Sequence, residues 1–426
     1  MSTFVVEGGT GPLRGRLRVP GDKSISHRAL LLAALAEGSS RLSGLSTGED
    51  VTATAAAVTA MGAQIEGDVV RGGRRRLHEP EGVLDVGNSG TSIRLLAGFC
   101  AALPWLSVLQ GDASIARRPM DRVVEPLRRM GAFVDGRHGG RLPPLVVRGG
   151  GLGGIDLDLE VPSAQVKGAV LLAGLAAAGE TVVRERVRTR AHSEEMLAAC
   201  GADIEVSVDG LTTTVRPSEL APFELDVPGD PSQAAFWLVA GCVVPGSEIT
   251  VERVYVGPGR AAFLDVLRRM GADLEIEPTS PTTATVTARH SPGLRGTTIG
   301  GGEVPSLIDE IPVLAVAAAV ADGPTEVRDA AELRVKESDR VATTVALLAA
   351  LGAASEPRPD GLVVAGGSRL TAGAVHSAGD HRIAMAAAVG ALVAPGATRI
   401  AGWGAVRTSY PRFQEDLRRL LAGGAP

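Results

Sequence analysis

The chain has 426 residues, of which 45% are hydrophobic and 21% are charged, a composition typical of a globular protein with two or three domains. The net charge of −5 and an aromatic content of 3% argue against a nucleic-acid-binding protein, which needs a basic surface and stacking rings. No apolar run reaches the roughly 18 residues of a membrane span. Since the first residues also lack the pattern of a secretory signal, we expect a cytoplasmic protein that binds neither membranes nor nucleic acids.

Cysteine and histidine give no sign of a disulfide framework or a metal site. Cys100, Cys200 and Cys242 lie far apart in apolar, Ala-rich segments and are predicted to be small buried side chains. The seven histidines show no spacing typical of metal ligands. We therefore predict that the protein uses no metal and no other cofactor.

The use of lysine is more informative. Of the 43 basic residues only Lys23, Lys167 and Lys336 are lysines, and Asn88 is the single asparagine. In a chain that otherwise uses arginine, a lysine indicates a position that needs a compact ammonium group. All four residues lie in polar, turn-like segments, where functional groups concentrate. Chance survival is the alternative explanation.

A helix that ends at a glycine recurs six times along the chain. Apolar residues at i, i+3 and i+4 followed by glycine predict a helix with its C-terminal stop. The six glycines are separated by 69 to 81 residues: Gly62, Gly131, Gly201, Gly271, Gly352 and Gly423. Alternating runs such as VDGLTTTVRP (208–217) and TTATVTA (282–288) follow and predict strands.

A second recurring element is a strand, a polar turn and a helix that is apolar nearly all round, which predicts a buried helix. The six turns are VPGDKSISHR (19–28), VGNSGTSIR (86–94), VPSAQVK (161–167), VPGDPSQ (227–233), VPSLIDE (304–310) and SAGDHR (377–382). The repeats therefore predict an α/β (α+β) fold of two similar domains. Each domain would hold three repeat units with buried parallel helices, and the active-site cleft would lie between the domains.

The polar turns also indicate the kind of ligand. Ser163, Asp230 and Asp380 are explained as N-caps of the helices that follow. Cations in a first turn oppose the helix dipole, so caps do not explain Lys23, Arg28, Arg94, Lys167 and Arg382. We interpret these cations as needing an anionic partner, and a small anionic ligand is the simplest.

Eight segments stand out in order along the chain: PGDKSISHRAL (20–30), GNSGTSIRLLAG (87–98), RRPMDRVVEPL (117–127), PSAQVKGAVLLAG (162–174), LIDEIPVLAVAAA (307–319), LRVKESDR (333–340), GDHRIAMA (379–386) and TSYPRF (408–413). With these segments the chain resembles the 3-phosphoshikimate 1-carboxyvinyltransferase (EPSP synthase) family of enolpyruvyl transferases. The resemblance implies six βαβαββ units in two domains, one of residues 21–227 and one of residues 1–20 plus 228–426. It also implies transfer of the enolpyruvyl group of phosphoenolpyruvate to the 5-hydroxyl of shikimate 3-phosphate, with release of phosphate, in aromatic amino acid biosynthesis.

The family pattern implies a role for each matching residue. The candidate catalytic residues are Lys23, Asp309 as base at the 5-hydroxyl, and Glu337 as proton donor at the enol methylene. The residues expected to bind phosphoenolpyruvate are Lys23, Gly90, Arg118, Gln165, Arg340, Arg382 and Arg407. Those expected to bind shikimate 3-phosphate are Ser24, Arg28, Ser163, Ala164, Gln165, Arg190, Asp309 and Lys336. We expect a monomer whose partners are these two small anions.

Two positions depart from the family pattern. Many relatives carry a second serine where Ala164 stands, which puts one hydroxyl contact to the shikimate phosphate in doubt. A lysine usually precedes the aromatic–Pro pair near the C-terminus, whereas this chain has AVRTSYP (405–411), so that Arg407 is the candidate replacement. The herbicide glyphosate occupies the phosphoenolpyruvate pocket of sensitive members. Gly90 favours sensitivity, although QVK (165–167) resembles the tolerant branch.

Several rival roles and functions stay open at this point. Glu337 could merely begin a helix, and Asp309 with Glu310 could be a first-turn dipole pair. His27 is expected to be a packed core residue. Lys167 could line the cleft or form a local salt bridge. The closest rival function is an enolpyruvyl transferase that acts on a UDP-sugar, but its characteristic loop cysteine is missing from QGDASIARRPMD (110–121). An RNA-end cyclase and a non-catalytic anion-binding repeat protein are two more distant rivals.

Overall fold

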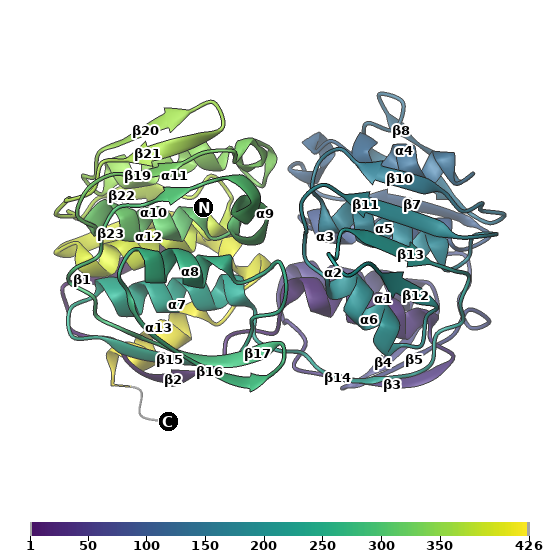
Figure 1. The fold of residues 1–426 in the computed structure, drawn as a ribbon, viewed down its shortest axis with the longest axis horizontal. Coiled ribbons are helices and arrows are strands. Elements are labelled where there is room, and N and C mark those ends of the chain that lie inside the picture. The colour runs from purple at the N-terminus through teal and green to yellow at the C-terminus, as the bar shows by residue number, and fades with distance from the viewer. Residues whose placement is uncertain (1, 424–426) are drawn as a thin grey trace. The chain divides into compact units, whose positions relative to one another are not determined.

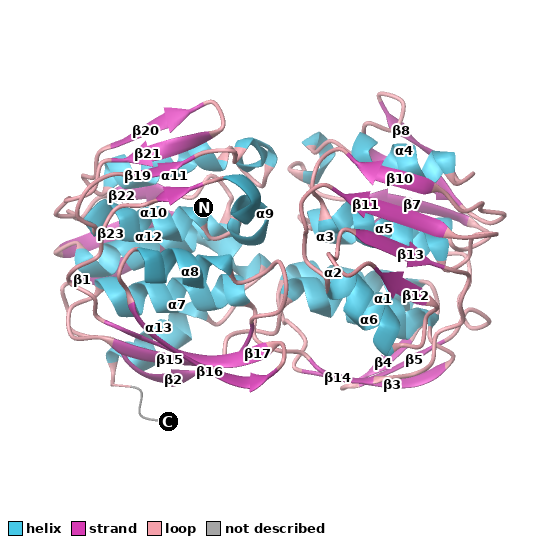
Figure 2. Ribbon diagram, viewed as in Figure 1, coloured by secondary structure: helices cyan, strands magenta, loops and turns pink. Residues whose placement is uncertain are grey.

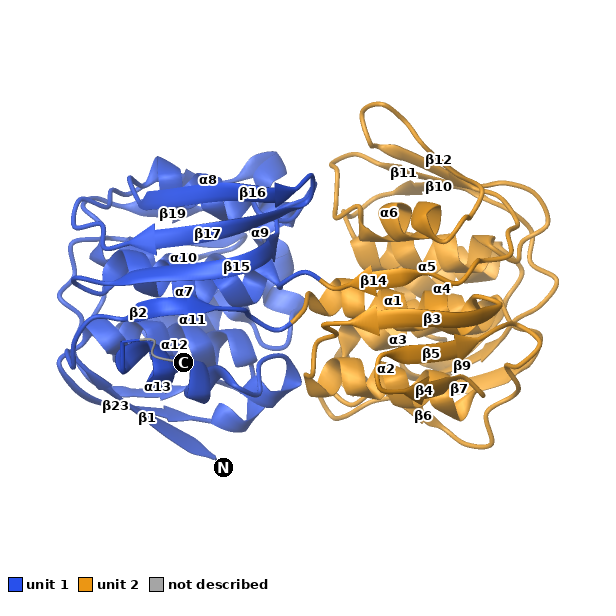
Figure 3. Ribbon diagram, turned by 90° about the horizontal axis from the view of Figure 1, so that it is seen from below, with its two compact units in different colours: residues 1–20, 228–426 blue, residues 21–227 orange. Residues whose placement is uncertain are grey.

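The computed structural model describes residues 2–423, and the chain divides into two compact units (Figure 3). Unit 1 comprises residues 1–20 and 228–426, and unit 2 comprises residues 21–227. Each unit contains three repeats of strands and helices, and each repeat has a small sheet of its own. The predicted α/β fold of two similar three-repeat domains is therefore confirmed.

Unit 2 contains three four-stranded sheets (Figure 1). Its first repeat consists of α1 (Lys23–Leu35), β3 (Gly38–Ser43), α2 (Glu49–Ala60), β4 (Gln64–Glu66), β5 (Val69–Gly72) and β14 (Glu224–Asp226). The second consists of β6 (Leu84–Asp85), α3 (Gly90–Ala101), β7 (Leu106–Gln110), η1 (Ile115–Arg117), α4 (Asp121–Arg129), β8 (Phe133–Arg137) and β9 (Leu142–Arg148). The third consists of β10 (Asp156–Leu159), α5 (Ala164–Gly174), β11 (Thr181–Glu185), α6 (His192–Ala199), β12 (Ile204–Val206) and β13 (Thr212–Val215).

Unit 1 contains two four-stranded sheets and one three-stranded sheet. Its first repeat consists of β2 (Arg14–Leu17), α7 (Pro231–Val243), β15 (Glu248–Tyr255), α8 (Ala262–Arg269), β16 (Asp273–Ser280) and β17 (Thr283–Arg289). The second consists of β18 (Thr298–Ile299), η2 (Gly301–Glu303), α9 (Val304–Leu307), α10 (Ile311–Val320), β19 (Thr325–Val327), η3 (Ala331–Val335), α11 (Arg340–Ala350), β20 (Ser355–Arg358) and β21 (Gly361–Val364). The third consists of β22 (Ala374–His376), α12 (His381–Val393), β23 (Gly396–Ala401), η4 (Trp403–Thr408), α13 (Phe413–Leu421) and β1 (Thr3–Gly8).

The sheets share one topology, and strands from distant parts of the sequence complete some of them. In each four-stranded sheet the first two strands of the repeat are parallel and the last two join antiparallel, as in the order β6-β7-β9-β8. β14 takes the place of the first strand of its repeat, parallel to β3. β1 pairs antiparallel with β23 and completes the last repeat. β2 likewise pairs parallel with β15, so three repeats contain a strand that lies far from them in the sequence.

The apolar helices form the inside of each unit, with the sheets around them (Figure 2). Every residue of α7 is buried, and α12 is buried except for its last residue. In unit 1, α7, α10 and α12 contact one another, and in unit 2, α3 contacts both α1 and α5. These helices have no polar face because they touch protein on every side, as their composition predicted.

The helix stops and strands predicted from the repeat are also confirmed. The six repeat glycines have φ between +77° and +105°, the left-handed conformation in which glycine ends a helix without steric cost. The fifth polar turn differs from its prediction, because residues Val304–Leu307 form the short helix α9 and only residues 308–310 remain as a turn. Pro305 lies in the first turn of α9, where proline is tolerated.

The cysteines and the lengths of the helices can also be compared with the sequence analysis. Cys100, Cys200 and Cys242 are free and buried, as predicted. None of the helices within residues 2–423 is long and apolar enough to cross a membrane.

Candidate active site

The polar turns place capping residues at the start of the inner helices. Asp22, Ser89, Ser163, Asp230 and Asp380 each accept a hydrogen bond from a backbone N–H in the first turn of the helix that follows. The cap interpretation of Ser163, Asp230 and Asp380 is therefore confirmed. These caps fix the first turns, which carry many of the candidate site residues.

In unit 2, Lys23 is the first residue of α1. Its Nζ lies 2.8 Å from Oδ2 of Asp50 in α2, and both side chains are largely buried. His27, one turn further along α1, is fully buried and its Nδ1 lies 2.7 Å from Oγ1 of Thr54. Burial, together with the charges of Lys23 and Arg28, holds the pKa of His27 well below its ordinary value. His27 is thus a neutral core residue, in agreement with its sequence interpretation.

Gly90 begins α3 beneath two guanidinium groups. A Cβ at this position would lie 2.4 Å from an Nη1 atom of Arg118 and 3.1 Å from Nη1 of Arg94. Arg94 donates to Oε1 of Gln165 over 2.8 Å, and Nε2 of Gln165 donates to Thr91 over 2.9 Å. The structure therefore brings together Gly90, Arg118 and Gln165, three of the residues expected to bind phosphoenolpyruvate.

A neighbouring group in unit 2 joins residues expected to bind shikimate 3-phosphate. Nη1 of Arg190 donates to Oγ of Ser24 over 3.1 Å. The buried guanidinium of Arg28 donates to the carbonyl oxygens of Ser24 and Ala164 and to the hydroxyl of Ser193. Ala164 therefore contributes its backbone carbonyl oxygen to this group.

In unit 1, Arg340 lies among three carboxylates. Its Nε donates to Asp380 over 2.8 Å and its Nη1 to Asp309 over 3.0 Å, while Nη2 donates to Glu337. Burial alone would lower the pKa of Arg340, but the charges of Asp380, Glu337 and Asp309 raise it above its ordinary value. One buried guanidinium thus ties together the candidate base Asp309 and the candidate proton donor Glu337.

Asp309 occupies the turn between α9 and α10, where it also contacts Arg382. Nη1 of Arg382 donates to the carbonyl oxygen of Asp309 over 3.1 Å, and Nη2 lies 3.6 Å from its carboxylate. Lys336 and Glu337 lie in the link between η3 and α11, whose N-cap is Asp339. Glu337 therefore does not cap the helix. Burial lowers the pKa of Lys336, with Asp309 opposing and Arg340 adding to the effect.

Arg407 is the remaining candidate and lies in η4 with an exposed side chain. The segment that follows is held by buried aromatic contacts. Trp237 donates to the hydroxyl of Tyr410 over 2.9 Å, and that hydroxyl donates to Asp416 over 2.8 Å. The aromatic–Pro pair of the motif therefore anchors the end of η4 in the core of unit 1.

All five first-turn cations contact acceptors within the protein, so the prediction that they need an external anion is wrong in part. Lys23 pairs with Asp50. Lys167 pairs with Glu185 and Glu194, and Arg382 pairs with Asp309. Arg28 and Arg94 donate to hydroxyl, amide and carbonyl oxygens. These contacts join residues far apart in the sequence, so the polar turns alone gave no sign of them.

Sequence reasoning missed Arg260 and the contacts that it makes with Glu310 and Asp230, two residues interpreted only as features of helix starts. Glu310 is buried beside Asp309, accepts from Ser232, and lies 3.3 Å from Nη1 of Arg260. Arg260 also donates to Asp230 over 2.7 Å. This cluster fixes the turn that carries Asp309. Within residues 2–423, no three His, Cys, Asp or Glu side chains are grouped as metal ligands would be.

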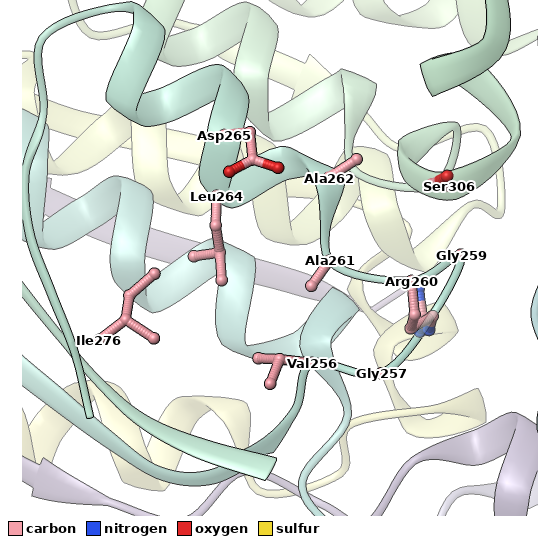
Figure 4. Close-up of a pocket in the computed structure, with 10 residues that line it drawn as sticks. All are labelled: Val256, Gly257, Gly259, Arg260, Ala261, Ala262, Leu264, Asp265, Ile276 and Ser306. Carbon is pink, nitrogen blue, oxygen red and sulfur yellow. The ribbon is translucent and has the colours of Figure 1, made fainter. Parts of the chain in front are cut away.

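Arg260 also borders a hollow of about 330 Å³ in unit 1 (Figure 4). The hollow is lined by Val256, Gly257, Gly259, Arg260, Ala261, Ala262, Leu264, Asp265, Ile276 and Ser306. None of these is a residue that the sequence predicts for the site. Since the guanidinium of Arg260 is directed to buried carboxylates, the hollow has no cationic group available at its wall.

Known proteins resemble this chain in both fold and sequence. An enolpyruvyl transferase of Streptomyces tendae, NikO, has a TM-score of 0.79 at 19% identity over 98% of this chain and 96% of its own, which shows a common fold. The EPSP synthase of Acinetobacter baumannii has a TM-score of 0.87 at 39% identity over 99% of this chain and 98% of its own. The fold is therefore that of the enolpyruvyl transferases.

The sequence narrows this class to one family. The sequence model of EPSP synthase (3-phosphoshikimate 1-carboxyvinyltransferase) matches residues 8–417. A 3-phosphoshikimate 1-carboxyvinyltransferase of Gloeobacter violaceus is 54% identical over 96% of this chain and 96% of its own. One of Herpetosiphon aurantiacus is 51% identical over 96% and 97%. The chain belongs to the EPSP synthase family, as the eight sequence motifs predicted, and the rival functions are not favoured.

Proposed function

We propose that this enzyme transfers the enolpyruvyl group of phosphoenolpyruvate to the 5-hydroxyl of shikimate 3-phosphate and releases inorganic phosphate. Membership of the EPSP synthase family over residues 8–417 carries the proposal. The chemistry supports it, because both substrates are anions and the candidate residues include six arginines and two lysines.

The reaction needs two proton transfers in its addition step and one in its elimination step. In the addition step the 5-hydroxyl oxygen bonds to C2 of phosphoenolpyruvate, the hydroxyl loses its proton, and the methylene carbon gains one to become a methyl group. In the elimination step the bond from C2 to the phosphate oxygen breaks and the methyl group loses a proton, which restores the double bond. Asp309 is the proposed base at the hydroxyl and Glu337 the proposed proton donor at the methylene.

Arg340 supports this pair of roles. Its guanidinium bonds to both Asp309 and Glu337, so it orients the two carboxylates relative to each other. The same guanidinium is one of the proposed ligands of phosphoenolpyruvate. Since its donors already reach three protein carboxylates, binding of that substrate would exchange at least one of these contacts for the substrate.

The residues of unit 2 are proposed to hold the phosphate groups. Arg118, Gln165 and Gly90 would bind phosphoenolpyruvate, and Ser24, Arg28 and Arg190 would bind shikimate 3-phosphate. The bonds that link Arg190 to Ser24 and Arg28 to Ala164 support the second group, because they gather donors from three segments of the chain. Lys23 is proposed to assist the proton transfer at the methylene, which a guanidinium cannot do.

Neither unit holds the complete set of groups that the reaction requires. The proposed acid and base, Glu337 and Asp309, belong to unit 1, whereas Lys23 and the phosphate-binding arginines Arg28 and Arg190 belong to unit 2. We further propose that the enzyme acts as a cytoplasmic monomer. Light scattering, which measures the mass of the purified protein in solution, tests whether it is a monomer.

The test measures phosphate release together with the mass of the organic product. Phosphate should appear only when phosphoenolpyruvate and shikimate 3-phosphate are both present, and the product should carry the added enolpyruvyl group. Asp309→Asn should abolish the release, while Asp322→Asn, an exposed aspartate of the same unit, should not. Release with a UDP-sugar in place of shikimate 3-phosphate would overturn the proposal.

A further inference from the structure

Lys167 is one of three lysines in the chain, and the proposed reaction leaves it without a role. It lies in the first turns of α5 with only 1% of its side chain exposed. Its Nζ lies 2.5 Å from Oε2 of Glu185 and 2.6 Å from Oε1 of Glu194. One ammonium thus faces two carboxylates. Lys167 forms a local salt bridge, which is one of the two roles that the sequence leaves open for it.

The two carboxylates bracket one short segment of the chain. Glu185 is the last residue of β11 and Glu194 lies in the first turn of α6, so residues 186–193 form the connection between them. Thr189, in the middle of that connection, donates its hydroxyl proton to the other oxygen of Glu185. Lys167 thus fixes both ends of the connection to α5, and Glu185 carries the restraint to its centre.

That connection carries Arg190. Nη1 of Arg190 reaches Ser24 in the first turn of α1 over 3.1 Å. Three residues beyond Arg190, the hydroxyl of Ser193 accepts from Nε of Arg28 over 2.7 Å. The direction in which Arg190 points therefore depends on a connection whose ends are held by a single buried ammonium.

The need for lysine rather than arginine follows from the size of the site. The ammonium is a compact donor that can approach two carboxylates at once, whereas a guanidinium is a planar fork with a longer reach. A side chain that is 1% exposed leaves no room for the larger group without displacement of Glu185 or Glu194. This accounts for a lysine at position 167 in a chain that carries arginine at nearly every other basic position.

We propose that Lys167 is a positioning residue for shikimate 3-phosphate, which acts by holding the connection of residues 186–193 so that Arg190 points to the substrate phosphate. The proposal rests on the proposed function, because it takes Arg190 as a ligand of that phosphate. The cluster of Lys167, Glu185 and Glu194 should therefore affect the binding of shikimate 3-phosphate and not the binding of phosphoenolpyruvate.

The test removes the charges of the cluster together, because removal of Lys167 alone would leave two buried carboxylates unpaired. The triple variant Lys167→Met, Glu185→Gln, Glu194→Gln keeps the shape and retains an acceptor for Thr189. We expect its KM for shikimate 3-phosphate to rise about 3- to 100-fold, in the range of couplings between contacting residues. Its KM for phosphoenolpyruvate should stay within about 2-fold and kcat within about 3-fold of the parent values.

Two further variants separate positioning from loss of stability. Val183→Ala removes buried methyl groups from the same strand, β11, and should lower the melting temperature without a change in either KM. Thr189→Val removes only the bond inside the connection and should raise the KM for shikimate 3-phosphate alone, so the proposal stays testable if the triple variant does not fold. The proposal would be overturned if the triple variant changed both KM values equally. It would also be overturned if the triple variant only lowered the melting temperature, as is expected of Val183→Ala.

A double-mutant cycle with Arg190→Ala identifies the path of the effect. If Lys167 acts through Arg190, the triple substitution adds no further rise in KM once Arg190 is alanine, whereas an additive rise would overturn the proposal. If Arg190→Ala leaves the KM for shikimate 3-phosphate unchanged, the proposed ligand role of Arg190 is wrong and this inference falls with it. If Arg190→Ala raises that KM and neither the triple variant nor Thr189→Val does, only the inference about Lys167 fails.

Discussion

Gly90→Ala adds one methyl group at a position where the structure leaves no room for it. The new Cβ would lie 2.4 Å from Nη1 of Arg118 and 3.1 Å from Nη1 of Arg94. An ordinary contact needs at least 3.4 Å, so the Arg118 guanidinium must retreat by about 1 Å. The guanidinium is the end of a flexible side chain and can move, so we expect the variant to fold.

The cost should fall on the ligands rather than on the fold. Overpacking of a tight site by one methyl group typically costs about 1–3 kcal/mol, which corresponds to about a 5- to 150-fold loss of affinity. Glyphosate, which occupies the phosphoenolpyruvate pocket of sensitive family members, is longer than phosphoenolpyruvate. We expect Gly90→Ala to weaken glyphosate toward the upper end of this range and phosphoenolpyruvate toward the lower end.

The assay compares the inhibition constant of glyphosate with the KM for phosphoenolpyruvate in the parent enzyme and the variant. Gly82→Ala is the matched control, because a Cβ there meets no atom within 4 Å, and both constants should stay unchanged. Equal weakening of the two ligands would show that the methyl group acts only through Arg118. A parent enzyme that already resists glyphosate would show that Gly90 does not set the length of this pocket.

Three other predictions follow from the proposed roles and from burial. Lys23→Arg should lower kcat about 100-fold or more at unchanged melting temperature, because a guanidinium does not release a proton at working pH; near-normal turnover in steady-state assays would make Lys23 only an anchor. Phosphate release should persist in excess chelator, because arginine and lysine neutralise the substrates; complete loss that a divalent ion restores would contradict the assigned roles. His27 is neutral in the folded enzyme and its pKa lies well below that of the unfolded chain, so its stabilising contribution is complete above pH 6.5 and is lost as the pH falls below that value. Unfolding curves of the parent at several pH values should show this loss as a slope of the unfolding free energy against pH of up to about 1.4 kcal/mol per pH unit, which corresponds to one proton. His27→Gln should remove this one-proton contribution to the slope, and an identical pH dependence in the two proteins would count against it.

The fold could be predicted because its signals are local. The stop at Gly62 and the cap at Ser163 each depend on a few neighbouring residues, and their recurrence at about 70 residues gave the number of repeats. The exchange of strands between distant repeats could not be read in this way. β14 lies about 180 residues beyond β3, and nothing in its three residues indicates that partner.

The contacts of the site were beyond local reasoning for the same physical reason. Lys23 was singled out as a candidate from its position in a polar turn, but its partner Asp50 lies 27 residues away on another helix. Arg340 was assigned to a substrate, although Asp380, 40 residues further on, already holds it. A first-turn cation shows that an anion is needed, and only the tertiary structure shows whether the protein supplies it.

That distinction decides how each cation can act. Lys167 faces two carboxylates, so we expect its effect on a substrate to pass through the chain that those carboxylates hold. Arg28 donates to two carbonyl oxygens and a hydroxyl, which come from α1, α5 and α6 and fix the direction of its guanidinium. The partners around each cation, more than its position in a helix, therefore show which parts of the chain it can orient.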